Sequence, residues 1–356
     1  MSYLDAQPGT IVRLTRSATV PEQVHVLAAE EIDAINAALA ARRPLLVRGE
    51  PGIGKSQLAR AAAKALGRVF LSQVVDSRTE SRDLLWHFDA VARLADAQLF
   101  GALGAFGVRR APHPDPGQAA DACTADWAAL EAAARVRLAV SRYVQPRALW
   151  WAFDWNSALA QAGALGIESP PQPDGGDPRQ GALVLIDEID KAESDVPNGL
   201  LEALGAGSFT PFGRQTPVTA VGEPPLVVIT TNEERTLPDA FLRRCLVLHL
   251  RLPREREPLI AQLVGRAAAH FPGADPEILR RAAGLLVEDR ETARREHWLP
   301  LPGQAEYLDL VRAVLALAGA GPGAAGLTAA EILDQVAGFV LRKHPEAVAG
   351  VDPEGT

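Results

Sequence analysis

One segment of this sequence, Gly49-Glu50-Pro51-Gly52-Ile53-Gly54-Lys55-Ser56, has the residue types and spacing that bind a polyphosphate. It follows the apolar run 44–47 and precedes an Ala- and Leu-rich stretch that begins at Gln57, so a strand, a turn and a helix are predicted in that order. The backbone N–H groups of such a turn and the positive end of the helix point at one anion. Lys55 can reach the terminal phosphates, and the Ser56 hydroxyl can ligate Mg²⁺. We therefore predict a nucleotide site from Gly49 to Gln57.

A second motif places two carboxylates at the end of a buried strand. The run 182–186 is apolar and is followed directly by Asp187 and Glu188. Such a run is typical of a strand that is buried on both faces of a parallel sheet, with its polar residues at the carboxyl end. Asp187 is predicted to complete the Mg²⁺ site, and Glu188 to polarise the water that attacks the terminal phosphate.

A third apolar run, 225–231, ends at Asn232, and the segment Leu237-Pro238-Asp239-Ala240-Phe241-Leu242-Arg243-Arg244-Cys245 follows it. If this run is a neighbouring parallel strand, Asn232 lies at the same sheet edge as Asp187 and Glu188. The order of the four motifs resembles the AAA+ ATPases and, within them, the MoxR family. The resemblance covers roughly residues 25–90 and 145–315.

The resemblance implies roles that spacing alone does not establish. Asn232 corresponds to the residue that orients the attacking water, and Arg244 to an arginine finger that enters the nucleotide site of a neighbouring subunit, with Arg243 as the competing candidate. A finger that acts in trans requires a homo-oligomer, and the family resemblance implies a hexameric ring. It also implies ATP and Mg²⁺ as cofactors, and a partner protein with a von Willebrand A domain.

The fold class predicted from these patterns is α/β. A P-loop AAA+ core with a parallel sheet flanked by helices is followed by a small all-helical lid domain. The predicted divisions are a polar lead-in (1–24), the nucleotide-binding domain (25–252), the helical lid (253–345) and a tail (346–356). Helices are expected at 28–43, 257–269, 276–288, 305–318 and 329–342, and a further strand at 69–74.

The distance between Lys55 and Asp187 is longer than a strand–helix–strand unit needs, which indicates an insertion at roughly 92–143. Its glycines, at 101, 104 and 107, precede prolines at 112, 114 and 116, and this pattern predicts a loop; the stretch 125–140 is predicted to be helical. The aromatic run 148–155 is expected to be core. A hairpin is predicted at roughly 205–222. By resemblance it faces the central channel of the ring, and we expect that it contacts the partner or substrate together with the insertion.

The predicted lid departs from the family pattern in one segment. Where MoxR-like ATPases often carry a basic residue just before a helix start, this chain has Trp298-Leu299-Pro300-Leu301-Pro302-Gly303-Gln304-Ala305-Glu306. Arg294, Arg295 and Arg312 remain alternatives for that role. The segment 290–295 mixes charges and is predicted to be a solvated helix face.

Composition favours a globular cytoplasmic protein. The net charge is −8, which disfavours non-specific binding to nucleic acid. No run of eighteen apolar residues occurs, and residues 1–30 lack an apolar stretch flanked by basic residues, so neither a membrane span nor a signal peptide is predicted. Two cysteines, Cys123 and Cys245, are too few for a disulfide framework or a zinc site.

Three functions are compatible with these patterns. The first is a Mg²⁺-dependent ATPase that forms a ring and remodels or activates a partner protein. The second is a nucleotide-dependent scaffold or switch that hydrolyses slowly or not at all, and the missing basic residue in the lid leaves room for it. The third, a nucleic-acid-processing AAA+ protein such as a restriction-type GTPase, is disfavoured by the acidic charge balance. The motifs leave the choice between ATP and GTP open.

Overall fold

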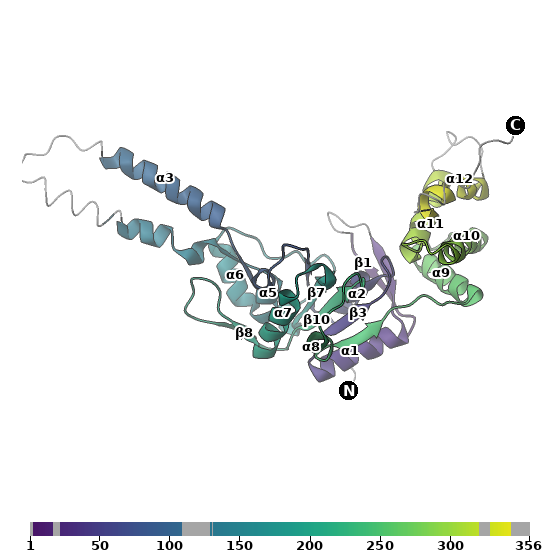
Figure 1. Cartoon of the computed structure of the whole chain (residues 1–356), viewed down its shortest axis with the longest axis horizontal. Coiled ribbons are helices and arrows are strands. Elements are labelled where there is room, and N and C mark those ends of the chain that lie inside the picture. The colour runs from purple at the N-terminus through teal and green to yellow at the C-terminus, as the bar shows by residue number, and fades with distance from the viewer. Residues whose placement is uncertain (1–2, 17–21, 109–128, 130, 320–327, 343–356) are drawn as a thin grey trace, which may run out of the picture.

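A five-stranded parallel sheet forms the centre of the molecule (Figure 1). The computed structural model describes residues 3–16, 22–108, 129, 131–319 and 328–342. The strand order is β11-β3-β10-β7-β4. These strands are β3 (Leu45–Arg48), β4 (Val69–Val74), β7 (Ala182–Asp187), β10 (Leu226–Thr231) and β11 (Leu246–His249). The three apolar runs that were predicted as strands are therefore strands, and β3, β10 and β7 lie next to one another.

Alternate residues of the central strands enter two separate hydrophobic cores, as the two-residue period of a strand requires. On one face, Leu45 and Leu185 pack with α1 (Ala29–Ala41) and α2 (Lys55–Ala65). On the other face, Leu46 and Ile186 pack with α5 (Ala148–Phe153) and α7 (Asp195–Ala206). The sheet is thus covered on both sides, which is the arrangement that an all-parallel sheet needs.

The N-terminal segment is part of the first core rather than a separate lead-in. Strand β1 (Ile11–Leu14) pairs antiparallel with β2 (Gln23–Val26). Leu4 and Leu14 are buried among residues of α1 and α2. The prediction of a polar lead-in missed this packing. Only a few side chains of the segment are apolar and buried, and the residues they contact are distant in the sequence.

The predicted insertion leaves the domain as a long arm, which projects from one end of the molecule in Figure 1. Its base is the antiparallel pair of β5 (Trp86–Phe88) and β6 (Val144–Pro146). The prediction of a glycine-rich loop was wrong, because α3 (Ala90–Val108) runs through Gly101, Gly104 and Gly107. Each glycine costs about 1 kcal/mol relative to alanine in a helix, but the Ala and Leu residues between them favour the helix. Residues 131–137 are helical, and the prolines at 112, 114 and 116 lie outside the described residues.

Two further predictions for this half of the molecule are confirmed. The aromatic run forms α5 and the start of α6 (Trp155–Ala164), and Trp150 and Phe153 are buried. The predicted hairpin consists of two short antiparallel strands, β8 (Ser208–Phe209) and β9 (Val218–Thr219). In the loop between them, Phe212 stacks on Trp86 at a ring-centroid distance of 6.0 Å.

The chain after β11 is helical and has its own hydrophobic core, which lies at the opposite end of Figure 1 from α3. Its helices are α9 (Arg256–His270), α10 (Pro276–Arg295), α11 (Gln304–Gly319) and α12 (Ala329–Leu341). All four predicted helices are present. Helix α10 continues to Arg295, almost two turns beyond its predicted end at 288. The predicted fold class, a parallel sheet flanked by helices and followed by a helical region, is confirmed.

Two other features bear on the sequence-based expectations. None of the helices within the described part of the chain is both long enough and apolar enough to cross a membrane. Cys245, which follows the short helix α8 (Asp239–Leu242), is buried, and burial raises the pKa of its thiol to about 11. This thiol is therefore protonated at neutral pH, whereas Cys123 lies outside the described residues.

The packing of β1 gives a direct test of the N-terminal finding. Replacing the buried Leu14 by alanine should lower the free energy of unfolding by about 2–5 kcal/mol, because it removes side-chain contacts and leaves a cavity. Ile11→Ala, on the half-exposed face of the same strand, should cost less than about 1 kcal/mol. Urea denaturation of both variants measures the difference, and equal small losses would show that β1 does not belong to the core.

Candidate functional site

The loop between β3 and α2 has the backbone of a phosphate-binding turn. Gly52 has φ 75° and Gly54 has φ 103°, in the left-handed region that glycine adopts without strain. A Cβ atom at Gly52 would lie 2.9 Å from the Cβ atom of Ala305, so the close approach of α11 also requires glycine there. Lys55 begins the helix, as the sequence predicts.

Lys55 lies inside this loop and reaches across to the next strand. Its Nζ donates hydrogen bonds to the carbonyl oxygens of Gly49 and Glu50, at 2.7 and 3.0 Å, and to Oδ1 of Asn232 at 2.7 Å. Burial lowers the pKa of Lys55, although the carboxylates of Asp187, Asp190, Glu188 and Glu233 act in the opposite direction. The ammonium group is thus held by neutral oxygens at the mouth of the turn, close to several anions.

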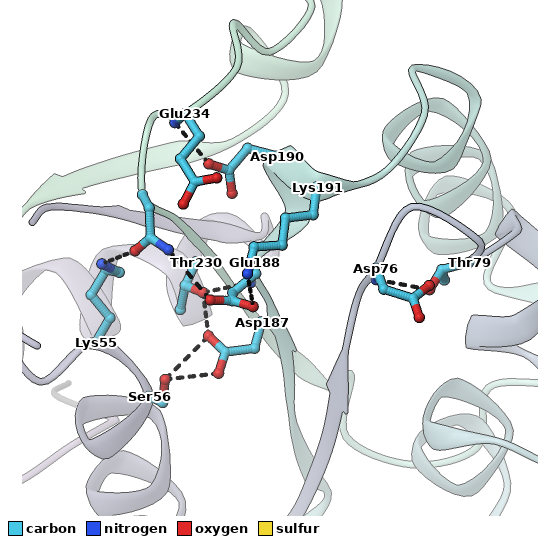
Figure 2. A network of polar contacts seen from close by, with 11 residues as sticks. Lys55, Ser56, Asp76, Thr79, Asp187, Glu188, Asp190, Lys191, Thr230 and Glu234 are labelled. Atoms are coloured by element: carbon cyan, nitrogen blue, oxygen red, sulfur yellow. Dashed lines mark hydrogen bonds and ion pairs between the residues drawn. The ribbon is translucent and has the colours of Figure 1, made fainter. Parts of the chain in front are cut away.

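Asp187 is the centre of the polar network shown in Figure 2. The Ser56 hydroxyl donates to its carboxylate, with Oγ 2.9 Å from Oδ2 and 3.1 Å from Oδ1. The Thr230 hydroxyl donates to Oδ1 and accepts a hydrogen bond from the backbone N–H of Glu188 at 3.0 Å. Sequence reasoning missed Thr230, although a hydroxyl at the end of an otherwise apolar buried strand is a detectable signal.

The oxygens of Ser56 and Asp187 fit a magnesium ion. Mg²⁺ prefers oxygen ligands and is usually held by one or two protein groups, with water and substrate phosphates completing its octahedron. In the described part of the chain, no group of three or more His, Cys, Asp or Glu side chains is arranged to hold a metal ion. Ser56 and Asp187 are a small oxygen donor set of the kind that magnesium uses, with the hydroxyl 2.9 Å from the nearer carboxylate oxygen.

Glu188 has an unusual backbone conformation at the end of β7. Its φ and ψ are 61° and 46°, a left-handed conformation that is uncommon for a residue with a side chain. Its Oε1 accepts a long hydrogen bond from Asn232 Nδ2 at 3.4 Å, and its Oε2 lies 2.7 Å from Lys191 Nζ. Strained residues of this kind cluster at functional sites, because the surrounding structure must hold them in place.

A cleft of about 270 Å³ brings most of the predicted site residues together, whereas Gly49, Glu50 and Ile53 line other cavities. It is lined by Pro51, Gly52, Gly54, Lys55, Ser56, Gln57, Asp187, Glu188, Asn232, Gln304, Ala305 and Leu308. Arg243 and Arg244 are exposed and do not line it. Their backbone carbonyls accept hydrogen bonds from the guanidinium group of Arg43.

A second cavity, of about 550 Å³, is lined by Ile53, the loop residue between Gly52 and Gly54 of the first cleft. Its walls are the connection between β2 and α1, from Val26 to Glu31, and the α9 residues Ala261, Gln262, Gly265 and Arg266. Different residues of the glycine-rich loop thus line the two cavities, and helices of the C-terminal region contribute to both, α11 to the first and α9 to the second.

Two arginines of the helical region hold the loop from outside. Arg290, on α10, is 1% exposed, and its guanidinium donates to both carboxylate oxygens of Glu50, at 2.7 and 2.5 Å, and to the carbonyl of Pro302. Arg266, on α9, donates to the carbonyl of Ile53 at 3.4 Å and to Oε1 of Gln304. The prediction that 290–295 is a solvated helix face was therefore wrong for Arg290, because its partner lies 240 residues earlier in the chain.

None of the three arginines considered for the family's basic lid residue lines the phosphate cleft. Arg294 lines a different cavity together with Glu50 and Arg254. Arg295 donates to Thr292, and Arg312 pairs with Asp309. Gln304, at the start of α11, occupies the cleft wall instead.

Comparisons with known proteins agree with this geometry. Residues 44–119, which include β3, the glycine-rich loop and α2, match the family described as AAA domain (dynein-related subfamily). The matched segment contains Lys55 and Ser56 and does not reach Asp187 or Asn232. Comparison of the sequence with curated proteins gives no significant match.

Two solved structures are similar only in a general way. A RuvB mutant from Thermotoga maritima is 13% identical, with a TM-score of 0.43, over 86% of this chain and 67% of that one. A protein from Cytophaga hutchinsonii, provisionally named an ATPase, is 14% identical, with a TM-score of 0.36, over 90% and 84% of the two chains. Because both TM-scores lie below 0.5, neither similarity supports a conclusion about this chain.

The ion pair between Arg290 and Glu50 makes a testable prediction about stability. Glu50→Gln leaves a buried guanidinium without its counter-charge, so the free energy of unfolding should fall by about 2 kcal/mol, less than for a fully buried pair because Glu50 is 44% exposed. The control is Asp334→Asn, which removes the ion-pair partner of Arg281, another arginine of α10. Both side chains of this pair are about half exposed, so the free energy of unfolding should fall by less than about 1 kcal/mol. Equal losses in urea denaturation would contradict the assigned role of Arg290.

Proposed function

We propose, from the premise that the chain carries an AAA+ ATPase core, that it is a MoxR-like ATPase. In this proposal it hydrolyses ATP with Mg²⁺ in a ring oligomer and uses the energy to remodel or activate a partner protein. The single observation that carries the hydrolytic part is the convergence of Lys55, Ser56, Asp187, Glu188 and Asn232 on one cleft. These residues lie at the carboxyl ends of β7 and β10 and at the start of α2, which follows β3, and together they would supply a phosphate cradle, a metal site and a candidate base.

The glycine-rich loop would hold the phosphates. Its backbone N–H groups and the N-terminus of α2 favour an anion, and Lys55 would exchange its bonds to Gly49 and Glu50 for phosphate oxygens. Ser56 and Asp187 would hold Mg²⁺, which supplies charge neutralisation at the β- and γ-phosphates. Thr230 fixes Asp187 and the backbone of Glu188 through one hydroxyl, so it is a positioning residue for both.

Glu188 and Asn232 would act on the attacking water. Both side chains line the cleft and contact each other at 3.4 Å, so one water molecule can contact both at the end of the phosphate chain. Asn232 would orient this water, and Glu188 would accept its proton. The neighbouring cavity between the β2–α1 connection and α9 would hold the nucleoside, which makes the helical region part of the binding site.

The arginines outside the cleft support the proposal of a ring. No arginine lines the phosphate cleft among the residues that the structure describes. Arg243 and Arg244 are both exposed beside the edge strand β11. A neighbouring subunit that presents Arg244, or Arg243, to this cleft would supply the charge that the site lacks for phosphoryl transfer. By resemblance, we propose a hexamer.

The α3 arm and the β8–β9 hairpin are proposed as the parts that engage the partner. Phe212 of the hairpin stacks on Trp86 and contacts Phe88 edge-on, at the base of the arm. The two elements are therefore joined at one aromatic cluster. By family resemblance the partner carries a von Willebrand A domain.

A slow or non-hydrolysing scaffold is the second candidate. The observation that favours it is Gln304, because an amide at the start of α11 carries no charge with which to sense a phosphate. The two candidates differ in turnover, so a hydrolysis assay separates them.

We expect Glu188→Gln to abolish turnover while leaving nucleotide binding intact. Loss of a general base lowers kcat by about 100- to 10,000-fold, whereas the amide preserves the shape of the cleft. Phosphate release from ATP and from GTP, and the Kd of a fluorescent ATP analogue, should be measured beside Glu193→Gln, an exposed carboxylate five residues away. Tight binding without turnover in the unaltered chain and both variants would favour the scaffold.

The finger assignment has its own test. Arg244→Ala should lower kcat by about 100-fold or more without changing nucleotide affinity, because the missing charge acts mainly on the transition state. Arg243→Ala is the competing variant, and Arg235→Ala, also exposed and in the same connection, is the control. Turnover per subunit of the unaltered protein should rise with protein concentration. Full activity in both Arg243→Ala and Arg244→Ala would remove the finger from this proposal.

A further inference from the structure

The carboxylate proposed as the base is already bound to a cation of its own chain. Lys191 Nζ lies 2.7 Å from Oε2 of Glu188, and Figure 2 shows the lysine side chain lying over this carboxylate. The two residues are three positions apart, at the two ends of the turn that contains the 3-10 helix Ile189–Lys191. The left-handed backbone of Glu188 begins this turn. The pair is therefore set by local geometry as well as by charge.

The stability of the fold does not require this ion pair. The side chains of Lys191 and Glu188 are 41% and 32% exposed, and pairs of this exposure contribute little to stability. Lys191 also donates to no other described residue. Because one partner of this ion pair is the proposed base, we expect the pair to affect the rate of hydrolysis more than the stability of the fold.

In this arrangement both carboxylate oxygens of Glu188 are engaged. Oε2 is bound to Lys191, and Oε1 faces the amide of Asn232. A general base needs an available oxygen at about 2.6–3.2 Å from the proton it takes. In this arrangement neither oxygen of Glu188 faces a water molecule without a competing contact from Lys191 or Asn232.

A second set of anions lies close to Lys191. The pKa of Lys191 is raised chiefly by its hydrogen bond to Glu188, and further by the charges of Glu234 and Asp190. Asp190 is buried, and its Oδ1 has no hydrogen-bond partner among the described residues, whereas Oδ2 accepts from the backbone N–H of Glu234. Lys191 can therefore leave Glu188 without losing all electrostatic stabilisation.

We propose that Lys191 is a positioning residue that withholds Glu188 from catalysis in the resting protein and must release it for each turnover. This inference rests on the proposed ATPase function and deepens it. In the hydrolytic state Glu188 faces the water beside Asn232, and Lys191 faces Glu234 and Asp190. The fraction of subunits in which the lysine has moved sets the basal rate.

Replacement of Lys191 by methionine tests the proposal, because methionine keeps much of the length and removes the charge. Lys191→Met should raise basal kcat about two- to five-fold, the factor that corresponds to a weak, half-exposed ion pair. The KM for ATP should stay within about two-fold, because the phosphate cradle is untouched. Lys191→Arg retains the charge and should behave like the unaltered protein. Arg179→Met, which removes an exposed ion pair with Asp177, is the matched control and should change nothing.

The double variant Lys191→Met with Glu188→Gln shows whether the lysine acts through Glu188. It should be as inactive as Glu188→Gln alone. An unchanged or lower kcat in Lys191→Met, in a protein whose unaltered form hydrolyses ATP and whose variant binds the fluorescent ATP analogue normally, would overturn the role of Lys191 and leave the proposed ATPase function standing. Turnover only in Lys191→Met would support both. Binding without turnover in every variant would overturn both.

Discussion

The position of β10 between β3 and β7 is the constraint on which the site depends. Ile229 lies beside Leu46 on one side and Ile186 on the other. All three strands run parallel, so their carboxyl ends meet at one sheet edge. β10 is buried along its whole length, and a shift of its register by one residue would place its core side chains on the wrong face. Burial of apolar side chains thus fixes the distances between Lys55, Asp187 and Asn232.

The helical region imposes a second constraint on the same loop. Arg290 and Arg266 reach the loop from α10 and α9 and contact Glu50 and the carbonyl of Ile53. Both guanidinium groups are largely removed from water, and burial lowers the pKa of Arg266. A buried charge is costly when it loses its partner. The helical region therefore cannot move far from the loop without exposing these arginines to water or leaving them unpaired, so the nucleotide cavities and the helical core form a coupled unit.

The sequence was sufficient for the parts of the structure that local patterns determine. The apolar runs before Asp187 and Asn232 identify buried strands, and the periodicity after residue 253 identifies four helices. Contacts between distant segments were not predictable in this way. The mixed charges around Arg290 are typical of a solvated helix face, and the same pattern occurs when one of the arginines is buried against a distant carboxylate. Only the folded chain shows that Arg290 binds Glu50. The glycines of α3 led to the opposite mistake. They predicted a loop, but the helix-forming residues around them outweigh their effect, and the segment is a helix.

The packing between the proposed catalytic turn and the arm gives a physical route by which nucleotide and partner can influence each other. Helix α7 begins four residues after Lys191, and Ser81 donates to the carbonyl of Asp195 in its first turn. The end of α7 leads directly into β8, whose hairpin loop carries the residue that stacks on Trp86. Each step is a close contact or a covalent connection within a packed region, where a displacement of one element requires its neighbours to adjust. A partner that shifts the arm would therefore also act on the turn that holds Glu188.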